Sequence, residues 1–210
     1  MLRQYQFTNR WFEPSKPIWD QLLARHRPDK ILEIGSYEGA SATYLIEKIC
    51  AERDLELHCI DTWEGSIENK LGGLSESNMA AVEQRFLENI DIATTKSKFL
   101  SKVIVRKGRS DIELAKLLAY GNAGFFNMIY VDGSHQAPDV LYDATVSFKL
   151  LTVGGLMIFD DYLWSEPLPG GRDILRCPKS AIDAFVNVNF RKLTILPAPA
   201  RQFCIVKTAE

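Results

Sequence analysis

The sequence predicts an α/β fold, a doubly wound and mostly parallel sheet that ends in an antiparallel hairpin. Apolar runs of strand length alternate with helical periods from residue 30 to residue 189, which is the pattern of a parallel sheet with helices on both faces. The last two apolar runs, 191–198 and 201–208, are separated only by a short Pro-Ala turn region. Because that region has no room for a helix, we expect the two runs to pair as a hairpin at the sheet edge.

Each expected element has a local signal. The expected strands before the hairpin are 30–36, 55–61, 102–108, 126–132 and 155–161. The expected helices are 15–29, 40–53, 75–90, 111–121, 137–151 and 179–189. Pro28 ends the first helix, Gly121 closes the fourth, and Pro138 lies in the first turn of the fifth.

Length and composition indicate a single domain over residues 1–210, with 46% hydrophobic and 25% charged residues. Within it, residues 1–29 form an N-terminal helical cover, and the loops 64–76 and 165–178 are candidate lids. The net charge of −2 gives no general attraction to nucleic acid or to an anionic membrane.

The remaining class signals point the same way. No apolar stretch approaches the roughly 20 residues of a spanning helix, the start lacks the features of a signal peptide, and the four cysteines show no metal or disulfide spacing. We therefore expect a cytoplasmic protein whose partner is a small molecule and neither a membrane nor a nucleic acid. The sequence is compatible with a homo-oligomer.

The first strand ends in a glycine turn of the form E-x-G-x-x-x-G, from Glu33 to Gly39. A dinucleotide fingerprint would need glycines at 33, 35 and 38, but Glu33 and Glu38 occupy two of these positions, and two carboxylates would repel a pyrophosphate. A nucleoside ligand with positive charge fits better, and S-adenosylmethionine, with its sulfonium and ammonium, is such a ligand. Gly35 would let the backbone approach it, and Gly39 would let the following helix pack closely. The alternative is a plain strand-to-helix turn.

Two further residues support a nucleoside site. Asp61 ends the second strand about 25 residues after the turn, where an acidic residue accepts hydrogen bonds from ribose hydroxyls. Ser110 follows the third strand and could reach the adenine. The alternatives are a strand-end turn for Asp61 and a helix N-cap for Ser110, and the N-cap role can coexist with adenine contact.

Acidic residues also end the fourth and fifth strands. Asp132 follows one, and Asp160 and Asp161 end the next. Neighbouring strand ends lie side by side, so we expect the three carboxylates to converge, which requires a proton or a cation. A divalent ion, Mg²⁺ or Mn²⁺, would satisfy them. The alternative is that Asp132 contacts the cofactor while the pair caps a turn.

His135 lies on the loop beyond Asp132. With an unperturbed pKa of about 6.5, its imidazole could take a proton from a substrate hydroxyl. The alternatives are that His135 lies at the start of the next helix or stacks on the adenine. Trp63, Tyr162 and Trp164 lie on loops at the same rim and could line the acceptor pocket, stack on the cofactor or pack in the core.

These segments carry a family resemblance over nearly the whole chain. ILEIGSYEGASA resembles the first motif of catechol, caffeoyl-CoA and bacterial O-methyltransferases, which are class I S-adenosylmethionine-dependent enzymes. YVDGSH and LLTVGGLMIFDDY resemble their metal-binding half, and the DD pair is similar to that of macrolide-sugar O-methyltransferases. In catechol-type enzymes a lysine stands at the position of His135, and commonly an asparagine at that of Asp161.

The resemblance implies a Rossmann-like methyltransferase fold with seven strands and a metal-dependent transfer of a methyl group to a hydroxyl of a sugar, diol or phenol. His135 and Asp132 would be catalytic, and Asp132, Asp160 and Asp161 would bind the metal. The residues expected at the cofactor are Glu33, Gly35, Ser36, Tyr37, Gly39, Ser41, Asp61, Thr62, Trp63, Ser110 and Asp132.

Other function classes stay open on the sequence alone. A nucleoside-binding protein without transfer activity is distinguished only by turnover, and an NAD-linked oxidoreductase by its response to NADH. A nucleic-acid methyltransferase is disfavoured because the chain has no N-P-P-Y-like motif and no basic stripe.

Overall fold

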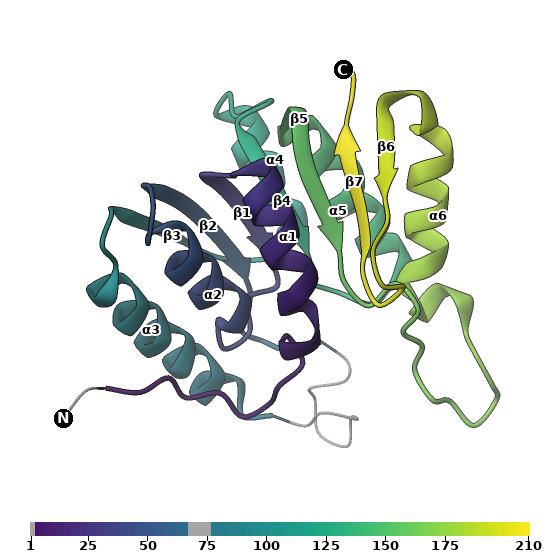
Figure 1. Cartoon of the computed structure of the whole chain (residues 1–210). Helices are drawn as coiled ribbons and strands as arrows, with labels where there is room; N and C mark the ends of the chain where they lie inside the picture. The colour runs from purple at the N-terminus through teal and green to yellow at the C-terminus, as the bar shows by residue number, and fades with distance from the viewer. Residues whose placement is uncertain (1–2, 67–76) are drawn as a thin grey trace.

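A computed structural model describes residues 3–66 and 77–210 of the chain. It contains one seven-stranded sheet with the order β3-β2-β1-β4-β5-β7-β6 (Figure 1). The strands are β1 Lys30–Ile34, β2 Leu55–Asp61, β3 Ser101–Lys107, β4 Phe126–Val131, β5 Leu151–Phe159, β6 Leu193–Leu196 and β7 Phe203–Lys207. The helices are α1 Lys16–His26, α2 Ala40–Ile49, α3 Met79–Lys96, α4 Ser110–Ala119, α5 Ala137–Leu150 and α6 Pro178–Val188.

The predicted topology is confirmed. Strands β1 to β5 pair in parallel, and β7 runs antiparallel to both β5 and β6. The terminal hairpin therefore inserts its second strand between β5 and the edge strand β6. The strand order reverses direction at β1, between β2 and β4, and such a switch point is where ligands bind in open α/β sheets.

Two apolar layers cover the sheet, because successive strand residues point to opposite faces. In β4, Met128 and Tyr130 face one layer, with α1, α2 and α3, while Ile129 and Val131 face the other, with α4, α5 and α6. Figure 1 shows the same arrangement, with α1, α2 and α3 on the near face. Both faces are buried, which explains why the strands read as continuous apolar runs.

Several boundaries differ from the sequence prediction. Strand β5 begins at Leu151, directly after α5, so the Gly154–Gly155 pair lies inside the strand instead of opening it. Gly154 has φ +85°, and the β4–β5 register shifts between Phe126 and Met128, so the strand accommodates the pair through an irregularity.

Helix ends also differ. Helix α2 stops at Ile49, because the chain turns there and the amides of Glu52 and Arg53 both donate to the Ile49 carbonyl. Helix α3 begins at Met79, after the N-cap Asn78, and continues to Lys96; the start of the range expected for it lies outside the described residues.

The N-terminal cover is helical only from Lys16 to His26, after a single 3-10 turn. Residues 3–9 contain no helix; they run beside α3. Glu38 accepts hydrogen bonds from the amide and the hydroxyl of Thr8, at 2.7 and 2.9 Å, and Asn89 binds both backbone groups of Gln6. Within the described ranges, no helix is long and apolar enough to cross a membrane.

Candidate active site

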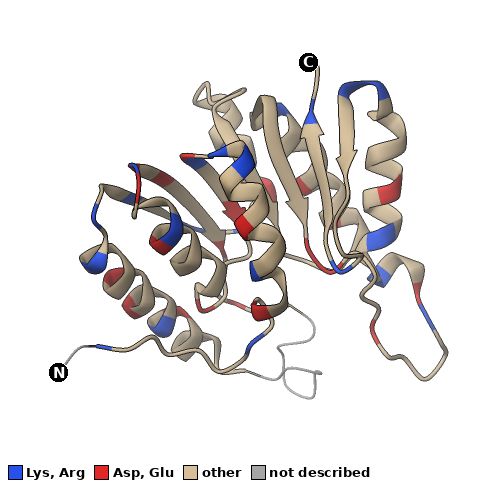
Figure 2. Cartoon of the chain, viewed as in Figure 1, with Lys and Arg blue, Asp and Glu red and all other residues tan. Residues whose placement is uncertain are grey.

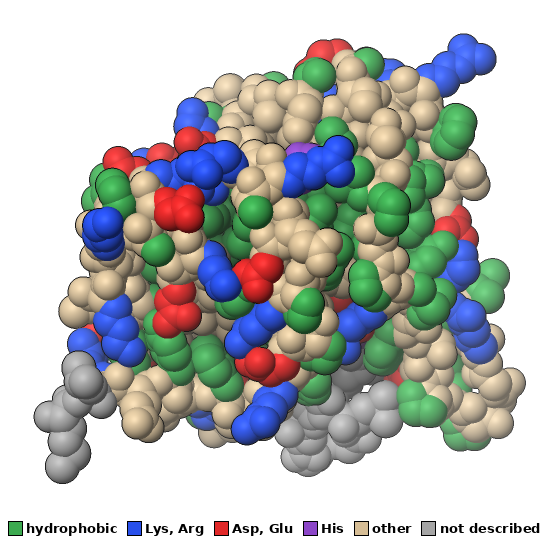
Figure 3. Space-filling view, viewed as in Figure 1, with side chains coloured by type: hydrophobic (Ala, Val, Ile, Leu, Met, Phe, Trp, Pro, Cys, Tyr) green, Lys and Arg blue, Asp and Glu red, His purple; other side chains and the backbone are tan. Residues whose placement is uncertain are grey.

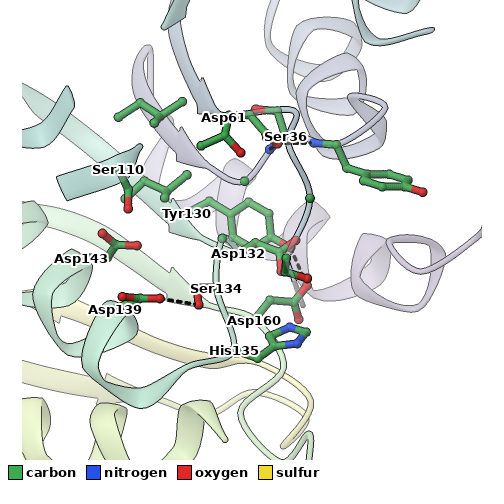
Figure 4. A pocket seen from close by; sticks show the side chains of 18 of the residues that line it. Ser36, Asp61, Ser110, Tyr130, Asp132, Ser134, His135, Asp139, Asp143 and Asp160 are labelled. Atoms are coloured by element: carbon green, nitrogen blue, oxygen red, sulfur yellow. Dashed lines mark hydrogen bonds between the residues drawn. The ribbon is translucent and has the colours of Figure 1, made fainter. Parts of the chain in front are cut away.

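A cavity of about 1080 Å³ opens at the carboxyl ends of β1, β2, β4 and β5. This is more than a drug-sized ligand needs, so the cavity can hold a nucleoside cofactor and a small acceptor together. In Figure 4, Asp61 and Ser110 lie on one side of it, and Asp160 and His135 lie on the other. We call these the nucleoside side and the acidic side.

The glycine turn forms the floor of the cavity. Gly35 has φ +85°, and a Cβ atom on it would lie 2.0 Å from the carbonyl oxygen of Asp132. Only glycine therefore allows β1 and β4 to end this close together. Gly39 does not line the cavity; a Cβ there would come within 3.0 Å of the Phe86 ring, in agreement with its expected packing role.

Asp61 holds this turn in place. Its Oδ2 accepts hydrogen bonds from the amides of Ser36 and Tyr37, each at 2.9 Å, and its Oδ1 accepts one from the amide of Trp63 at 2.8 Å. A carboxylate has about four acceptor positions, so one remains for a ligand hydroxyl. Asp61 therefore has the turn role that the sequence left as one alternative, and its remaining acceptor position is compatible with the other, contact with a ribose hydroxyl.

Glu33 is buried beneath the same turn and does not line the cavity. It accepts hydrogen bonds from the hydroxyls of Ser36 and Ser41, both at 2.5 Å. Burial raises the pKa of Glu33 to about 7. We expected Glu33 to contact the cofactor. In the structure it instead bonds to Ser36 and Ser41, which line the cavity.

Trp63 packs in the core, which the sequence analysis left as one alternative, and it does not line the cavity as expected of a cofactor residue. Its indole is buried against Phe86, with ring centroids 4.8 Å apart, and donates to the Tyr37 carbonyl at 2.9 Å. Tyr162 likewise bonds to Asp183 and does not line the cavity. Of the three aromatic residues expected at the rim, Trp164 lines it.

The other expected cofactor residues do line the cavity, namely Gly35, Ser36, Tyr37, Ser41, Asp61, Thr62, Ser110 and Asp132. Ser110 is the first residue of α4, and the N-cap is Arg109, so the cap alternative is wrong for its side chain. No residue of the candidate lid 165–178 lines the described part of the cavity. Most of the other lid, 64–76, lies outside the described residues.

The sequence reasoning missed Asp143 on α5. Its side chain is buried, lines the nucleoside side, and takes a hydrogen bond from Ser110. Burial raises its pKa to about 7, and its Oδ1 has no hydrogen-bond partner among the described residues. An acidic residue on the apolar stripe of that helix, among Val140, Ala144 and Phe148, was the available signal.

The acidic side is built differently from the expected triplet. One ligand atom each from Asp132, His135 and Asp161 lie within 4.8 Å of one another. His135 Nε2 lies 3.1 Å from Asp161 Oδ2, and its ring stacks on Trp164 with centroids 4.1 Å apart. His135, expected as a base, thus takes the place in the donor group that the sequence predicts for Asp160.

Asp160 turns toward Tyr130 instead. The Tyr130 hydroxyl lies 2.5 Å from Asp160 Oδ2 and 2.8 Å from Asp132 Oδ2 (Figure 4). Burial and the neighbouring carboxylates raise the pKa of both aspartates. Since a phenol has a single proton, the two carboxylates share it through Tyr130. Asp160 thus lines the cavity but does not belong to the group formed by Asp132, His135 and Asp161.

Two carboxylates and an imidazole form a donor set that suits a divalent cation. Carboxylate oxygens suit Mg²⁺ and Mn²⁺, and an imidazole is a common ligand for transition metals. Three protein donors would leave positions for water and a substrate. The residues therefore fit the ion that the sequence predicts.

Comparison with known proteins assigns the family. Residues 32–162, more than half of the chain, match the model of a methyltransferase domain family. No curated protein matches the sequence.

Among solved structures, the fold is similar to an O-methyltransferase from Bacillus cereus in complex with SAH, with 15% identity, 98% of this chain and 84% of that chain covered, and a TM-score of 0.66. It is also similar to the O-methyltransferase TomG from Streptomyces achromogenes in complex with SAM, with 18% identity, 94% and 80% coverage, and a TM-score of 0.63.

The match includes the glycine turn, Asp61 and both acidic strand ends. It confirms the resemblance to methyltransferases drawn from the sequence, and the chain belongs to the methyltransferase domain family.

Proposed function

We propose that the protein transfers a methyl group from S-adenosylmethionine to a hydroxyl of a small molecule, and that it needs a divalent cation to do so. The observation that carries this proposal is the meeting of Asp132, His135 and Asp161 in the same cavity as Asp61. A nucleoside site without an acceptor site would not need this donor group.

Different residues of the cavity would bind the cofactor and position the acceptor. The glycine turn and Asp61 would hold the ribose, and Ser110 and Asp143, which line the cavity, would border the adenine. Asp132 joins the two sides, because its carbonyl contacts Gly35 while its carboxylate belongs to the donor group. The cofactor and the acceptor oxygen would therefore meet near Asp132, and positioning of this kind contributes up to roughly 7–11 kcal/mol in favourable cases.

Asp132, His135 and Asp161 would hold the cation. When bound, the cation would lower the pKa of the acceptor hydroxyl and hold it in place. His135 lines the same cavity, so its imidazole would serve either as a ligand of the cation or as the proton acceptor for the hydroxyl.

A methyl-transfer screen tests the proposal. We would incubate the protein with S-adenosylmethionine and vicinal diols, sugars, phenols and hydroxy acids, with and without EDTA. We expect turnover that EDTA abolishes and Mg²⁺ or Mn²⁺ restores, while SAH still raises the melting temperature in EDTA. Full activity in EDTA would contradict the metal requirement, and stabilisation by NADH but not by SAH would contradict the cofactor.

His135→Ala separates the two roles of the imidazole. If His135 is the base, the variant binds Mn²⁺ normally and turns over roughly 10²–10⁴-fold more slowly. If it is a ligand, Mn²⁺ affinity falls together with turnover. Normal turnover and normal Mn²⁺ affinity would exclude both roles.

A further inference from the structure

Arg201 reaches the acidic side of the cavity from the turn of the β6–β7 hairpin. Its backbone is fixed, because its carbonyl accepts from the Tyr162 amide at 2.9 Å. The next residue, Gln202, bonds to the Pro199 carbonyl at 3.0 Å. The buried Gln202 side chain also accepts from Trp19 at 2.9 Å. Figure 2 shows acidic and basic segments meeting where β5 and the hairpin end. Arg201 is thus a cation on a rigid support beside Asp160, on the acidic side of the cavity.

The guanidinium of Arg201 has unused hydrogen-bond donors. Its Nε is buried and has no hydrogen-bond partner in the described part of the chain. Asp160 Oδ1 lies 3.8 Å away, too far for a hydrogen bond, and already accepts from the Asp161 amide at 2.8 Å. The side chain is 37% exposed and lines the cavity. Desolvated donors without partners are costly, and arginine offers five in a planar fork.

The other arginine that lines the described part of the cavity is arranged differently. Arg109, on the nucleoside side, places Nε 3.1 Å from one carboxylate oxygen of Asp111 and Nη2 2.9 Å from the other. That fork is already occupied by a carboxylate. Unlike the guanidinium of Arg109, that of Arg201 is therefore not held by a carboxylate of the protein at hydrogen-bond distance.

Charge on the acidic side supports an anionic ligand. A divalent cation would offset two of the three carboxylates of Asp132, Asp160 and Asp161, and Arg201 offsets the third. With the cation and Arg201 both present, these three carboxylates would leave no net negative charge that repels an anion. Guanidinium groups bind carboxylates and phosphates in a bidentate manner, with charge-assisted hydrogen bonds.

We infer that the methyl acceptor carries a carboxylate or phosphate group close to its reacting hydroxyl, and that Arg201 binds this group. The inference rests on the proposed function, since it names the substrate class of the same cavity. Arg201 is then a specificity-determining residue that selects hydroxy acids or phosphorylated alcohols over neutral alcohols.

Calorimetry with three probes of similar shape tests the inference. SAH binding is measured first, and then benzoate, phenyl phosphate and benzyl alcohol are titrated into the protein with saturating SAH and Mg²⁺. We expect benzoate, phenyl phosphate or both to bind about tenfold or more tightly than benzyl alcohol. The stronger of the two anions identifies carboxylate or phosphate as the recognised group.

Variants assign the preference to its residue. Arg201→Ala should remove the preference for the anion, Arg201→Lys should keep part of it as a point charge, and Arg109→Ala should keep it in full. Each variant is compared at equal SAH saturation, with its melting temperature as a fold control.

Three results would overturn the inference. They are equal binding of all three probes, an anion preference that survives Arg201→Ala and so belongs to the metal, and an anion preference that Arg109→Ala removes. Each of these with normal SAH binding leaves the proposed function standing. Absence of SAH binding would instead remove the proposed function, and the inference with it.

Discussion

At the scale of single residues, the carboxylate of Asp61 serves the fold and the ligand site together. It accepts three backbone amides, from Ser36, Tyr37 and Trp63, and keeps one acceptor position toward the cavity. Tyr37 and Trp63 both have positive φ, 47° and 49°, a conformation that costs non-glycine residues free energy. The amide hydrogen bonds to Asp61 help to hold it.

The substitution Asp61→Ala therefore affects binding and stability. We expect it to weaken SAH binding by about 1–3 kcal/mol, because charge-assisted hydrogen bonds are lost, and also to lower the free energy of unfolding, because three amides lose their acceptor. Calorimetry and urea denaturation measure the two effects. Unchanged SAH affinity in a folded variant would contradict the ribose role.

Glu33 makes stability depend on pH. Its pKa is about 7 in the folded protein, against 4.5 for an ordinary glutamate. The unfolded chain therefore loses this proton at lower pH than the folded one, and the folded state is increasingly penalised as pH rises from 4.5 to 7. The full difference is about 3 kcal/mol above that window and disappears below pH 4.5.

Glu33→Gln removes this titration. The variant should gain stability relative to the natural protein between pH 5 and pH 8, as measured by urea denaturation at both values. Since Asp143 titrates in the same range in both proteins, only the difference between them is interpreted. A difference that is constant with pH would contradict a raised pKa for Glu33.

The sequence predicts which residues lie at the site better than it predicts which groups their side chains contact. Strand ends of a parallel sheet converge, so Asp61, Asp132 and Asp161 could be placed at one rim from their positions alone. The presence of His135 in the donor group instead of Asp160 could not be predicted, because it depends on Tyr130 in β4, whose hydroxyl contacts both Asp132 and Asp160. The position of Arg201 at the cavity could not be predicted either, because this residue lies in the β6–β7 hairpin, far in sequence from the other residues of the site.

At the scale of elements, the turn between β1 and α2 depends on how closely β1 approaches the end of β4. Gly35 and Gly154 share φ +85°, but a Cβ on Gly35 would collide with Asp132, while one on Gly154 would have nothing within 4 Å. Substitutions at these two glycines therefore distinguish the cost of a steric collision, at Gly35, from the cost of backbone strain alone, at Gly154.

We expect Gly154→Ala to cost about 1–2 kcal/mol, from the left-handed backbone alone. Gly35→Ala should cost clearly more and abolish SAH binding, because the turn must move away from Asp132. Urea denaturation and calorimetry of both variants check this. Equal costs would contradict a close approach of the two strands.

Element identities could be predicted more completely than element ends. Alternating apolar runs and helical periods identified all seven strands and the hairpin, since these signals are local. The start of β5 at Leu151 could not be found, because it depends on pairing with β4 around the Gly154–Gly155 pair. The path of residues 3–9 depends on the buried side chains Glu38 and Asn89, which the sequence does not reveal.

At the scale of the whole molecule, the cavity joins both halves of the chain. Strands β1 and β2 supply the turn and Asp61, whereas β4 and β5 end in the donor group of Asp132, His135 and Asp161. Asp132 contacts both parts. We therefore predict that two ligands, a nucleoside cofactor and a divalent cation, bind side by side in one cavity.

Titration of Mn²⁺ into the SAH-bound protein, followed by calorimetry, tests this claim most directly. The natural protein should bind Mn²⁺, and Asp161→Asn should weaken that binding by roughly tenfold or more while SAH affinity is retained. Asp139→Asn is the matched control, because this carboxylate lines the same cavity but is bonded to Ser134 at 2.8 Å; it should bind Mn²⁺ normally. Absence of Mn²⁺ binding in the natural protein, or equal Mn²⁺ affinity of Asp161→Asn and Asp139→Asn, would contradict the account.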